Sequence, residues 1–351
     1  MNVKAHVSVN IPSLVMMKST ITISDVAREA GVSTQTVSRV LNNKGEISPT
    51  TRRLVSEVIQ RLGYRPNAVA RSLVTRRTLS LGLVVPDIAN PFFPEIARGA
   101  EDVALAAGYS VFLCNTIEQA EREVAVLRLL EEKRVDGVVV CSARLPDEQL
   151  VPMLKRQHAV VLVNRTVPNE TAGTVRVDDA SGSRQAVGHL LAGHRRRLAM
   201  LAGPENSHSG RERVHGFRNA VGDAGGLHDP SSIVSCPPYL EGGYQAATSL
   251  LSANRGIDGL VCYNDLVAIG ALQACHDLGV RVPDDVAIVG CDDILLARLV
   301  TPSLTTMRVS KYEIGASAVR MLLGRIAGSG HRGERAEVVI RPELVARASA
   351  P

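Results

Sequence analysis

The sequence predicts a small all-α helix-turn-helix headpiece joined to a larger two-lobed α/β domain built from doubly wound parallel sheets. Residues 1–77 contain 12 Lys and Arg against 4 Asp and Glu, so the rest of a chain with net charge +5 has a charge of −3. From residue 79, continuous apolar runs alternate with helical stretches, which is typical of βαβ units. A basic segment on a mildly acidic body indicates a polyanion-binding module on a regulator or an enzyme.

Residues 1–20 are expected to form a disordered leader, and Met16 or Met17 could be the true start. Pro12 interrupts their apolar character, and no continuous apolar core leads to a cleavage site, so a signal peptide is not expected. No apolar run in the chain approaches the roughly 18 residues that span a bilayer, which predicts a cytoplasmic protein without a membrane partner. The six cysteines form no C-x-x-C motif and are expected to be buried, reduced thiols.

Three short helices are predicted in the headpiece, residues 21–63. Thr22 precedes the first helix and forms a near capping box with Asp25. Ser33 caps the second helix, and Ser48 caps the third, which has proline at its first position. Apolar residues at helical spacing should form the inner faces of the three helices. They are Val26, Ala27, Ala30, Val37, Val40, Leu41, Leu54, Val58 and Leu62.

A helix, a tight turn at Gly31 and a second helix form a helix-turn-helix, whose second helix reads the major groove. Its outward face carries short polar side chains, of which Gln and Asn can pair with adenine, Arg with guanine, and Ser and Thr with phosphates. A solvated face of a small helical domain would look similar, but the surrounding charge of +8 favours DNA reading. The expected DNA-binding residues of the headpiece are Thr22, Ser33, Thr34, Gln35, Thr36, Ser38, Arg39 and Asn42.

Residues 64–78 are predicted to contain a hinge helix and a linker. Asn67 can cap a short helix in which Val69 and Leu73 lie on one side. Such a helix is marginal in water, where isolated helices need roughly 12–15 residues, so it should order only with a partner. Leu73 and its copy in a second subunit could insert into a minor-groove step and kink the DNA. The alternative is a plain interdomain linker.

Residues 79–347 contain too many strand-like runs for one small sheet, which predicts two doubly wound lobes. The clearest predicted strands are residues 79–87, 109–115, 136–141, 159–164, 197–203, 258–265, 286–293 and 336–341. Ligands of such sheets bind beyond the carboxyl ends of the strands. These ends are polar here and comprise Asp87, Asn115, Asn164, Asn264, Asp265, Asp292 and Asp293.

Two stretches, "TISDVAREAGVSTQTVSRVLN" and "ISPTTRRLVSEVIQRLGYRPNAVARSL", resemble the lactose/galactose repressor (LacI–GalR) family of bacterial transcription regulators. The body resembles the family's effector domain, which is related to periplasmic sugar-binding proteins, in "VPDIANPFF", "RERVHGF", "YNDLVAIGAL" and "GVRVPDDVAIVGCDD". The resemblance covers about residues 21–345. It implies a homodimeric repressor that binds double-stranded, near-palindromic operator DNA and is switched by a small, sugar-like molecule between the lobes.

The resemblance and the strand ends together indicate an effector site. Phe92 and Phe93 could offer a flat surface to a sugar or base ring, although two adjacent phenylalanines could also be core residues. Arg213 matches the arginine that clamps the effector in relatives. The expected site comprises Asp87, Asn90, Phe92, Phe93, Asn164, Arg165, Ser209, Arg213, Asn264 and Asp292. Relatives often have an aromatic where Cys291 stands, and some have a larger side chain than Thr34, so neither effector nor operator can be copied from them.

Two other classes of protein are less consistent with the sequence. An enzyme is disfavoured because the chain has no P-loop, no G-x-S-x-G and no H-E-x-x-H motif, so no catalytic residue, metal or cofactor is expected. A secreted sugar-binding protein would share the body but leave the basic headpiece unexplained. The chain ends soon after residues 336–341 with no leucine heptad, which predicts a dimer rather than a tetramer.

Overall fold

The computed structural model describes residues 21–42, 45–64, 77–168, 171–225, 232–253, 256–328 and 336–351. Its contacts divide the chain into two units, residues 1–76 and 77–351, and the division falls in the predicted linker. The expected leader and the hinge helix, with Asn67 and Leu73, lie outside the described residues. Among the described residues, no helix is long and apolar enough to cross a membrane.

Within its described residues, the first unit contains three helices whose starts follow the predicted caps. The helices are α1 Ile23–Glu29, α2 Thr34–Leu41 and α3 Pro49–Leu62. Thr22 and Asp25 form a reciprocal capping box, in which the Thr22 amide donates to the Asp25 carboxylate at 2.9 Å. The hydroxyl of Ser33 accepts from the amide of Thr36 at 3.1 Å, and Ser48 caps α3 in the same way. Each cap satisfies an amide that the first helical turn leaves without a partner.

The core of this unit differs from the prediction at α3. Val55 and Val58 are buried, whereas Leu54, predicted to face inward, is 45% exposed. Val55, Val58 and the half-buried Leu62 also follow helical spacing, and this face packs against α1 and α2. The prediction favoured Leu54 because its side chain is larger than that of Val55. Burial depends instead on which face of α3 packs against the neighbouring helices. The predicted inner faces of α1 and α2 are confirmed, with Leu41 half-buried.

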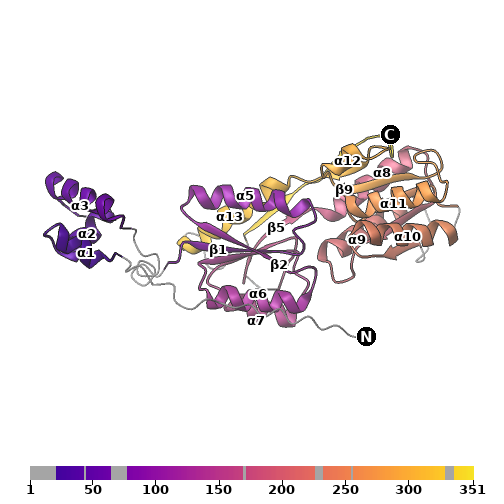
Figure 1. Ribbon diagram of the computed structural model, residues 1–351. Helices are drawn as coiled ribbons and strands as arrows, with labels where there is room; N and C mark the ends of the chain where they lie inside the picture. The colour runs from indigo at the N-terminus through magenta and orange to yellow at the C-terminus, as the bar shows by residue number, and fades with distance from the viewer. Residues whose placement is uncertain are drawn as a thin grey trace, which may run out of the picture. The chain divides into compact units, whose positions relative to one another are not determined.

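In the first lobe, six parallel strands follow the order β11-β5-β4-β3-β1-β2. They are β1 Ser80–Val85, β2 Ser110–Asn115, β3 Gly137–Cys141, β4 Val160–Val163, β5 Gly173–Val177 and β11 Glu337–Ile340. Helices lie on both faces of this sheet, with α5 and α13 on one side and α6 and α7 on the other (Figure 1). These helices are α5 Phe92–Ala106, α6 Ala120–Glu132, α7 Asp147–Lys155 and α13 Lys311–Ala327.

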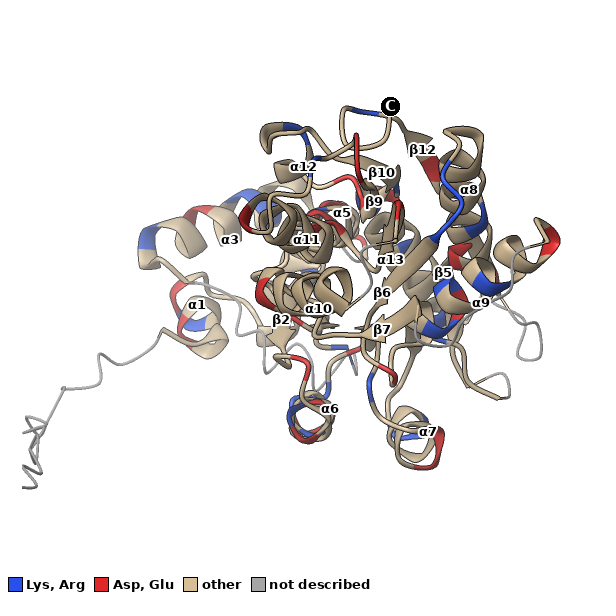
Figure 2. Cartoon of the chain, turned by 90° about the vertical axis from the view of Figure 1, so that its right-hand side faces the viewer, with Lys and Arg blue, Asp and Glu red and all other residues tan. Residues whose placement is uncertain are grey.

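The second lobe repeats this plan, with the strand order β12-β10-β9-β8-β6-β7 and only β12 antiparallel. Its strands are β6 Leu198–Ala202, β7 Ile233–Ser235, β8 Gly259–Cys262, β9 Ala287–Asp292, β10 Thr305–Arg308 and β12 Glu343–Val345. Helices α8 and α9 lie on one side of this sheet, and α10 and α11 lie on the other (Figure 2). The helices are α8 Asp179–Ala192, α9 His208–Asp223, α10 Leu240–Ala253, α11 Asp265–Asp277 and the short α12 Leu296–Leu299.

The chain passes between the lobes three times, from β5 to α8, from β10 to α13 and from β11 to β12. The two doubly wound lobes are therefore confirmed, together with all eight predicted strands. Strand β2 lies at a sheet edge rather than inside the sheet, and Phe112 on it is 51% exposed. Cys114, on the same strand, is only half-buried, whereas the other five cysteines are buried and all six are free thiols.

Candidate ligand pocket and recognition helix

A pocket lies between the two lobes, at the carboxyl ends of their strands. Eight of the ten expected effector-site residues line it, namely Asn90, Phe92, Phe93, Asn164, Ser209, Arg213, Asn264 and Asp292. Five further residues line it that the sequence did not indicate, namely Glu118, Ser142, Arg144, Pro238 and Tyr263. The walls thus combine aromatic rings with amides, carboxylates and guanidinium groups, a set that suits a small polar ligand with an apolar face.

The first lobe contributes the aromatic wall. The Asn90 carboxamide oxygen accepts from the amide of Phe92 at 3.0 Å, which fixes the loop that leads into α5. The rings of Phe92 and Phe93 meet edge to face, with centroids 5.2 Å apart. Both rings are buried in the core and also line the pocket, so the core interpretation is confirmed, whereas contact with a ligand ring remains a prediction. Asn164, with φ of 53°, accepts from the amide of Val177 at 3.0 Å.

The second lobe contributes a buried arginine. Arg213 Nε donates to Asp179 Oδ1 at 2.7 Å, Nη1 donates to the Tyr263 carbonyl, and the guanidinium lies 5.0 Å from the Tyr263 ring centroid. Burial opposes the charge of Arg213, but Asp179 and other nearby groups hold its pKa well above the ordinary value. Asn264 caps α11 through the Val267 amide at 2.8 Å. Arg213 is therefore a fixed, charged donor at the pocket wall.

Asp292 ends β9 at the pocket with an unusual backbone, since its φ is 121°. The ammonium group of Lys311 donates to the backbone carbonyls of Asp292 and Asp293, at 2.7 and 3.0 Å, and so supports this turn. Burial raises the pKa of Asp292 to about 7, although Arg213 and Lys311 act in the opposite direction. The carboxyl group therefore changes protonation near neutral pH. Ser209, on α9 of the same lobe, also lines the pocket and has a buried hydroxyl without a hydrogen-bond partner.

Two expected site residues lie outside the pocket lining. Asp87 accepts from the amide of Ala89 at 3.0 Å in the loop after β1. Arg165 donates to Asp147 at 2.5 Å and to the carbonyl of Leu145 at 3.2 Å. Both side chains serve local structure at the strand ends, and their role in ligand binding remains a prediction.

The unexpected residue with the most distinctive environment is Arg144, in the loop after β3. Its Nε donates to Glu118 Oε2 at 2.5 Å, and its Nη2 donates to Glu118 Oε1 at 3.2 Å. Burial opposes the charge of Arg144, but Tyr263 and Glu118 hold its pKa above the ordinary value. Ser142 follows β3 directly, so the strand-end argument could have found it. No local pattern marks Arg144 or Glu118, because their partnership spans 26 residues of sequence.

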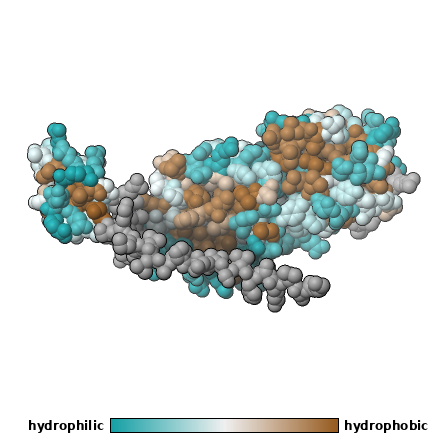
Figure 3. All heavy atoms as spheres, viewed as in Figure 1, coloured by the Kyte–Doolittle hydropathy of each residue, from teal (hydrophilic) through white to brown (hydrophobic). Residues whose placement is uncertain are grey.

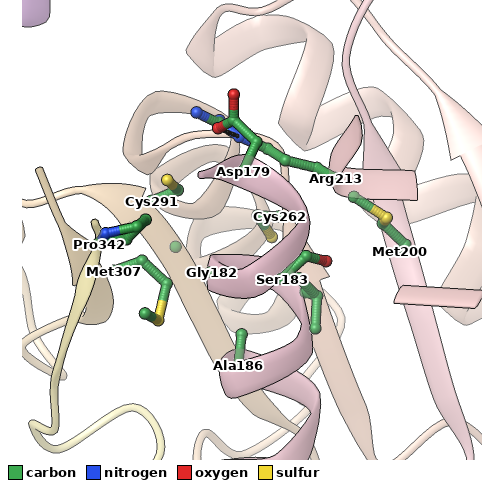
Figure 4. Close-up of a pocket in the computed structure, with 12 residues that line it drawn as sticks. Asp179, Gly182, Ser183, Ala186, Met200, Arg213, Cys262, Cys291, Met307 and Pro342 are labelled. Atoms are coloured by element: carbon green, nitrogen blue, oxygen red, sulfur yellow. Dashed lines mark hydrogen bonds and ion pairs between the residues drawn. The ribbon is translucent and has the colours of Figure 1, made fainter. Parts of the chain in front are cut away.

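A second, small and mainly apolar pocket lies in the second lobe between α8 and the sheet (Figure 4). Met200, Cys291 and Met307 line it together with Ser183 and Ala186. Asp179 and Arg213 also belong to its lining, and Arg213 lines the inter-lobe pocket as well. Cys291 therefore faces a region of small and flexible side chains. It does not fill this region as an aromatic residue at the same position would.

In the headpiece, α2 carries the residues that are expected to read DNA. Thr34, Gln35, Arg39 and Asn42 are exposed, whereas Thr36 and Ser38 are half-buried. Asn42 donates through its side chain to the Ser38 carbonyl at 2.8 Å. The capping hydroxyls of Thr22 and Ser33 lie at the starts of α1 and α2, where amides could also hold a phosphate. The exposed set suits base and phosphate contacts.

Comparisons with known proteins agree with this geometry. Residues 22–67 match the model described as "Bacterial regulatory proteins, lacI family", and residues 78–348 match "Periplasmic binding proteins and sugar binding domain of LacI family". The chain is 40% identical to the ribose operon repressor of Halalkalibacterium halodurans, covering 87% of this chain and 90% of that one. It is 35% identical to the transcriptional repressor PurR of Aliivibrio fischeri, covering 93% and 98%.

Solved structures show the same similarity. A lac repressor dimer bound to operator and the anti-inducer ONPF is 27% identical, with a TM-score of 0.85 and coverage of 95% of this chain and 99% of that one. A complex of the transcriptional regulator CelR with cellobiose is 31% identical, with a TM-score of 0.72 and coverage of 94% and 99%. With both of its units matched to models of one family, the chain belongs to the LacI family of bacterial regulatory proteins.

Proposed function

We propose that this chain is a sequence-specific transcriptional repressor whose operator affinity is controlled by a small, sugar-like molecule in the inter-lobe pocket. One observation carries the proposal: a helix-turn-helix with an exposed polar second helix occurs in one chain with a two-lobed domain that encloses a polar, aromatic-walled pocket. The ribose operon repressor and PurR support the repressor half by their names. The lac repressor on its operator and CelR with cellobiose support DNA binding and sugar binding in turn.

The DNA-binding role rests on α2 and on charge. Gln35 and Arg39 are exposed and have the donor and acceptor groups that read base edges in a major groove. The net charge of +8 in residues 1–77 supplies the sequence-independent attraction to phosphates. Thr22, Ser33, Thr34 and Asn42, together with Asn67 and Leu73 of the expected hinge, complete the proposed interface. Binding to bacterial DNA would place the chain in the cytoplasm.

The second half of the proposal is ligand binding without chemistry. The two arginines of the pocket lining are held in fixed hydrogen-bonded pairs, Arg213 with Asp179 and Arg144 with Glu118, which suits recognition of a polar molecule. The relatives are named as regulators rather than enzymes, which supports the same conclusion. Asp87 and Arg165 would act at the margin of this site rather than in its lining.

A homodimer is the proposed assembly. Exposed apolar residues gather on β2 and α12, including Phe112, Leu113, Leu295, Leu296 and Leu299. Figure 3 shows hydrophobic surface over both regions in one view. Clustered apolar side chains of this kind mark protein interfaces more often than free surface. The similar lac repressor is a dimer on its operator, which supports the same assembly.

The test is a gel shift with the promoter region next to the chain's own gene. The intact protein should shift this DNA with a steep salt dependence, and a sugar panel should change the shift. A protein without residues 1–76 should not bind the DNA but should still bind the active sugar. Operator binding by that truncated protein would contradict the assignment of DNA reading to the first unit.

A further inference from the structure

One nitrogen of Arg144 is buried without a hydrogen bond to the protein, although Tyr263 lies near the guanidinium and raises its pKa. Its side chain is 4% exposed, and the residue lines the inter-lobe pocket. Two of its three guanidinium nitrogens donate to Glu118, whereas Nη1 is buried and has no hydrogen-bond partner. A buried donor without a partner is costly, and it usually indicates a ligand or a bound water that completes it. The position of Arg144 in the pocket wall favours a ligand.

Glu118 determines which chemical group of a ligand Arg144 can bind. The carboxylate pairs with two guanidinium nitrogens, so the charge of Arg144 is neutralised within the protein. Glu118 lines the pocket as Arg144 does. The pair therefore presents a donor next to an acceptor with no net charge. Two neighbouring hydroxyl groups match this arrangement, because one oxygen can accept from Nη1 while the other donates to the carboxylate.

The second lobe also contributes a paired arginine to the lining. Arg213 of the second lobe is paired with Asp179, and both side chains are almost fully buried. The remaining charged group in the lining is Asp292, which is an acid. Within the described lining, no cation is left without a carboxylate partner. A phosphate or carboxylate on the ligand would meet Asp292 without an unpaired positive charge to compensate it.

We propose that the Arg144–Glu118 pair binds a vicinal diol of the effector and, together with the Arg213–Asp179 pair, selects uncharged sugars against their phosphorylated or acidic forms. This inference rests on the proposed function, since it names the ligand class of the same pocket. It adds Arg144 and Glu118 as specificity-determining residues. It also assigns each lobe one neutralised guanidinium clamp, so a closed pocket holds hydroxyl groups from both sides.

The first experiment uses calorimetric titration of the full-length chain with matched probes. The neutral probes are D-ribose, D-glucose and cellobiose, and the charged probes are D-ribose 5-phosphate, D-glucose 6-phosphate and D-gluconate. At least one neutral probe should bind, and its charged counterpart should bind at least about tenfold more weakly, because the charge gains no partner in the pocket. Tighter binding of any charged probe than of its neutral form would overturn the proposed selectivity.

The second experiment changes Arg144. Arg144→Lys keeps a positive partner for Glu118 but removes the forked donor, and Arg144→Gln removes the charge as well. Both variants should bind the best neutral probe about tenfold or more weakly, as expected for the loss of a hydrogen bond from a charged group. Arg156→Gln is the matched control, because Arg156 pairs with Glu131 in the same forked manner on the exposed surface of the first lobe. The control should bind like wild type.

Monodeoxy forms of the best sugar separate direct contact from a structural role. On wild type, removal of either hydroxyl of the recognised diol should weaken binding, whereas Arg144→Lys should bind those deoxy sugars and the parent sugar about equally. Wild-type affinity in both Arg144 variants, or an unchanged deoxy penalty in Arg144→Lys, would overturn the role of this pair. Failure of every neutral probe to bind would overturn the ligand class, while the operator gel shift would still test the regulator function independently.

Discussion

Arg213 lies where three interactions meet: an ion pair with Asp179, a hydrogen bond to the Tyr263 carbonyl and a contact with the Tyr263 ring. Arg213 lines the inter-lobe pocket, so we propose it as a charged donor to the ligand. We expect Arg213→Ala to weaken sugar binding strongly and to leave operator affinity without sugar nearly unchanged. Separate titrations of each variant with sugar and with operator would measure both.

The same change should also affect stability, because it leaves Asp179 buried without its partner. Breaking a buried ion pair from one side costs about 3–5 kcal/mol. Urea unfolding of the variant would measure this loss, and Arg213→Lys should recover part of it while binding sugar poorly. Unchanged sugar affinity in a folded Arg213→Ala protein would show that the site is misplaced.

Asp292 predicts a dependence on pH. Its pKa is raised by burial to about 7, whereas the ordinary value is 3.8. Between these values the native state keeps a proton that the unfolded chain has lost, so this group makes the free energy of unfolding fall as pH rises. The contribution can reach about 1.4 kcal/mol per pH unit. The free energy of unfolding of Asp292→Asn, measured by urea titration, should fall less steeply between pH 4 and 7 than that of wild type. An identical slope for the two proteins would refute the assignment.

At the scale of elements, the strands and caps with local signals were predictable. The continuous apolar runs of β1 and β3 and the caps at Thr22 and Ser33 depend on neighbouring residues, and the structure agrees with them. Strands β5, β7, β10 and β12 were missed, because they are short and mix polar with apolar residues. Their strand conformation comes from pairing with distant strands, such as β10 beside β9.

The site shows the same limit. Strand ends placed Asn164 and Asp292 near the pocket, since parallel strands deliver their carboxyl ends to one edge. Arg144 and Glu118 lie in loops, and only the folded chain brings them together across 26 residues. The choice of Leu54 over Val55 failed for a related reason, because helical spacing alone does not say which face a neighbouring helix covers.

The DNA contacts proposed for α2 and α3 can be distinguished by mutation. Gln35 on α2 is an exposed candidate for base contact, so Gln35→Ala should lose about 1–3 kcal/mol on the cognate operator and little on random DNA. Arg53 on α3 is highly exposed and pairs with Glu57, so a phosphate contact from it would help both DNAs equally. Arg53→Ala should therefore weaken both. Binding titrations at one fixed salt concentration would compare them, and equal losses for Gln35→Ala would exclude it from the reading face.

For the whole molecule, the exposed apolar residues predict where two copies meet. Phe112→Asp on β2, or Leu299→Asp on α12, would place a charge in the proposed interface, whose desolvation is unfavourable. We expect wild type to be a dimer in light scattering and each variant to dissociate at higher protein concentration than wild type. Operator affinity should fall with dimerisation, since two headpieces bind a near-palindromic site together. Dimers of unchanged stability in both variants would place the interface elsewhere.

The three passages of the chain between the lobes have a consequence for synthesis on the ribosome. Strand β11 completes the first sheet and β12 completes the second, and both lie within residues 337–345. The first lobe also needs α13, which packs against α5, a helix more than 200 residues earlier in the chain. Neither sheet can therefore be completed before residues 337–345 have left the ribosome, whereas the helices of residues 21–64 precede both sheets in the chain, depend on local contacts and can fold earlier. Nascent chains that stall before residue 337 would combine these folded helices with two incomplete sheets, and would be natural clients for chaperones.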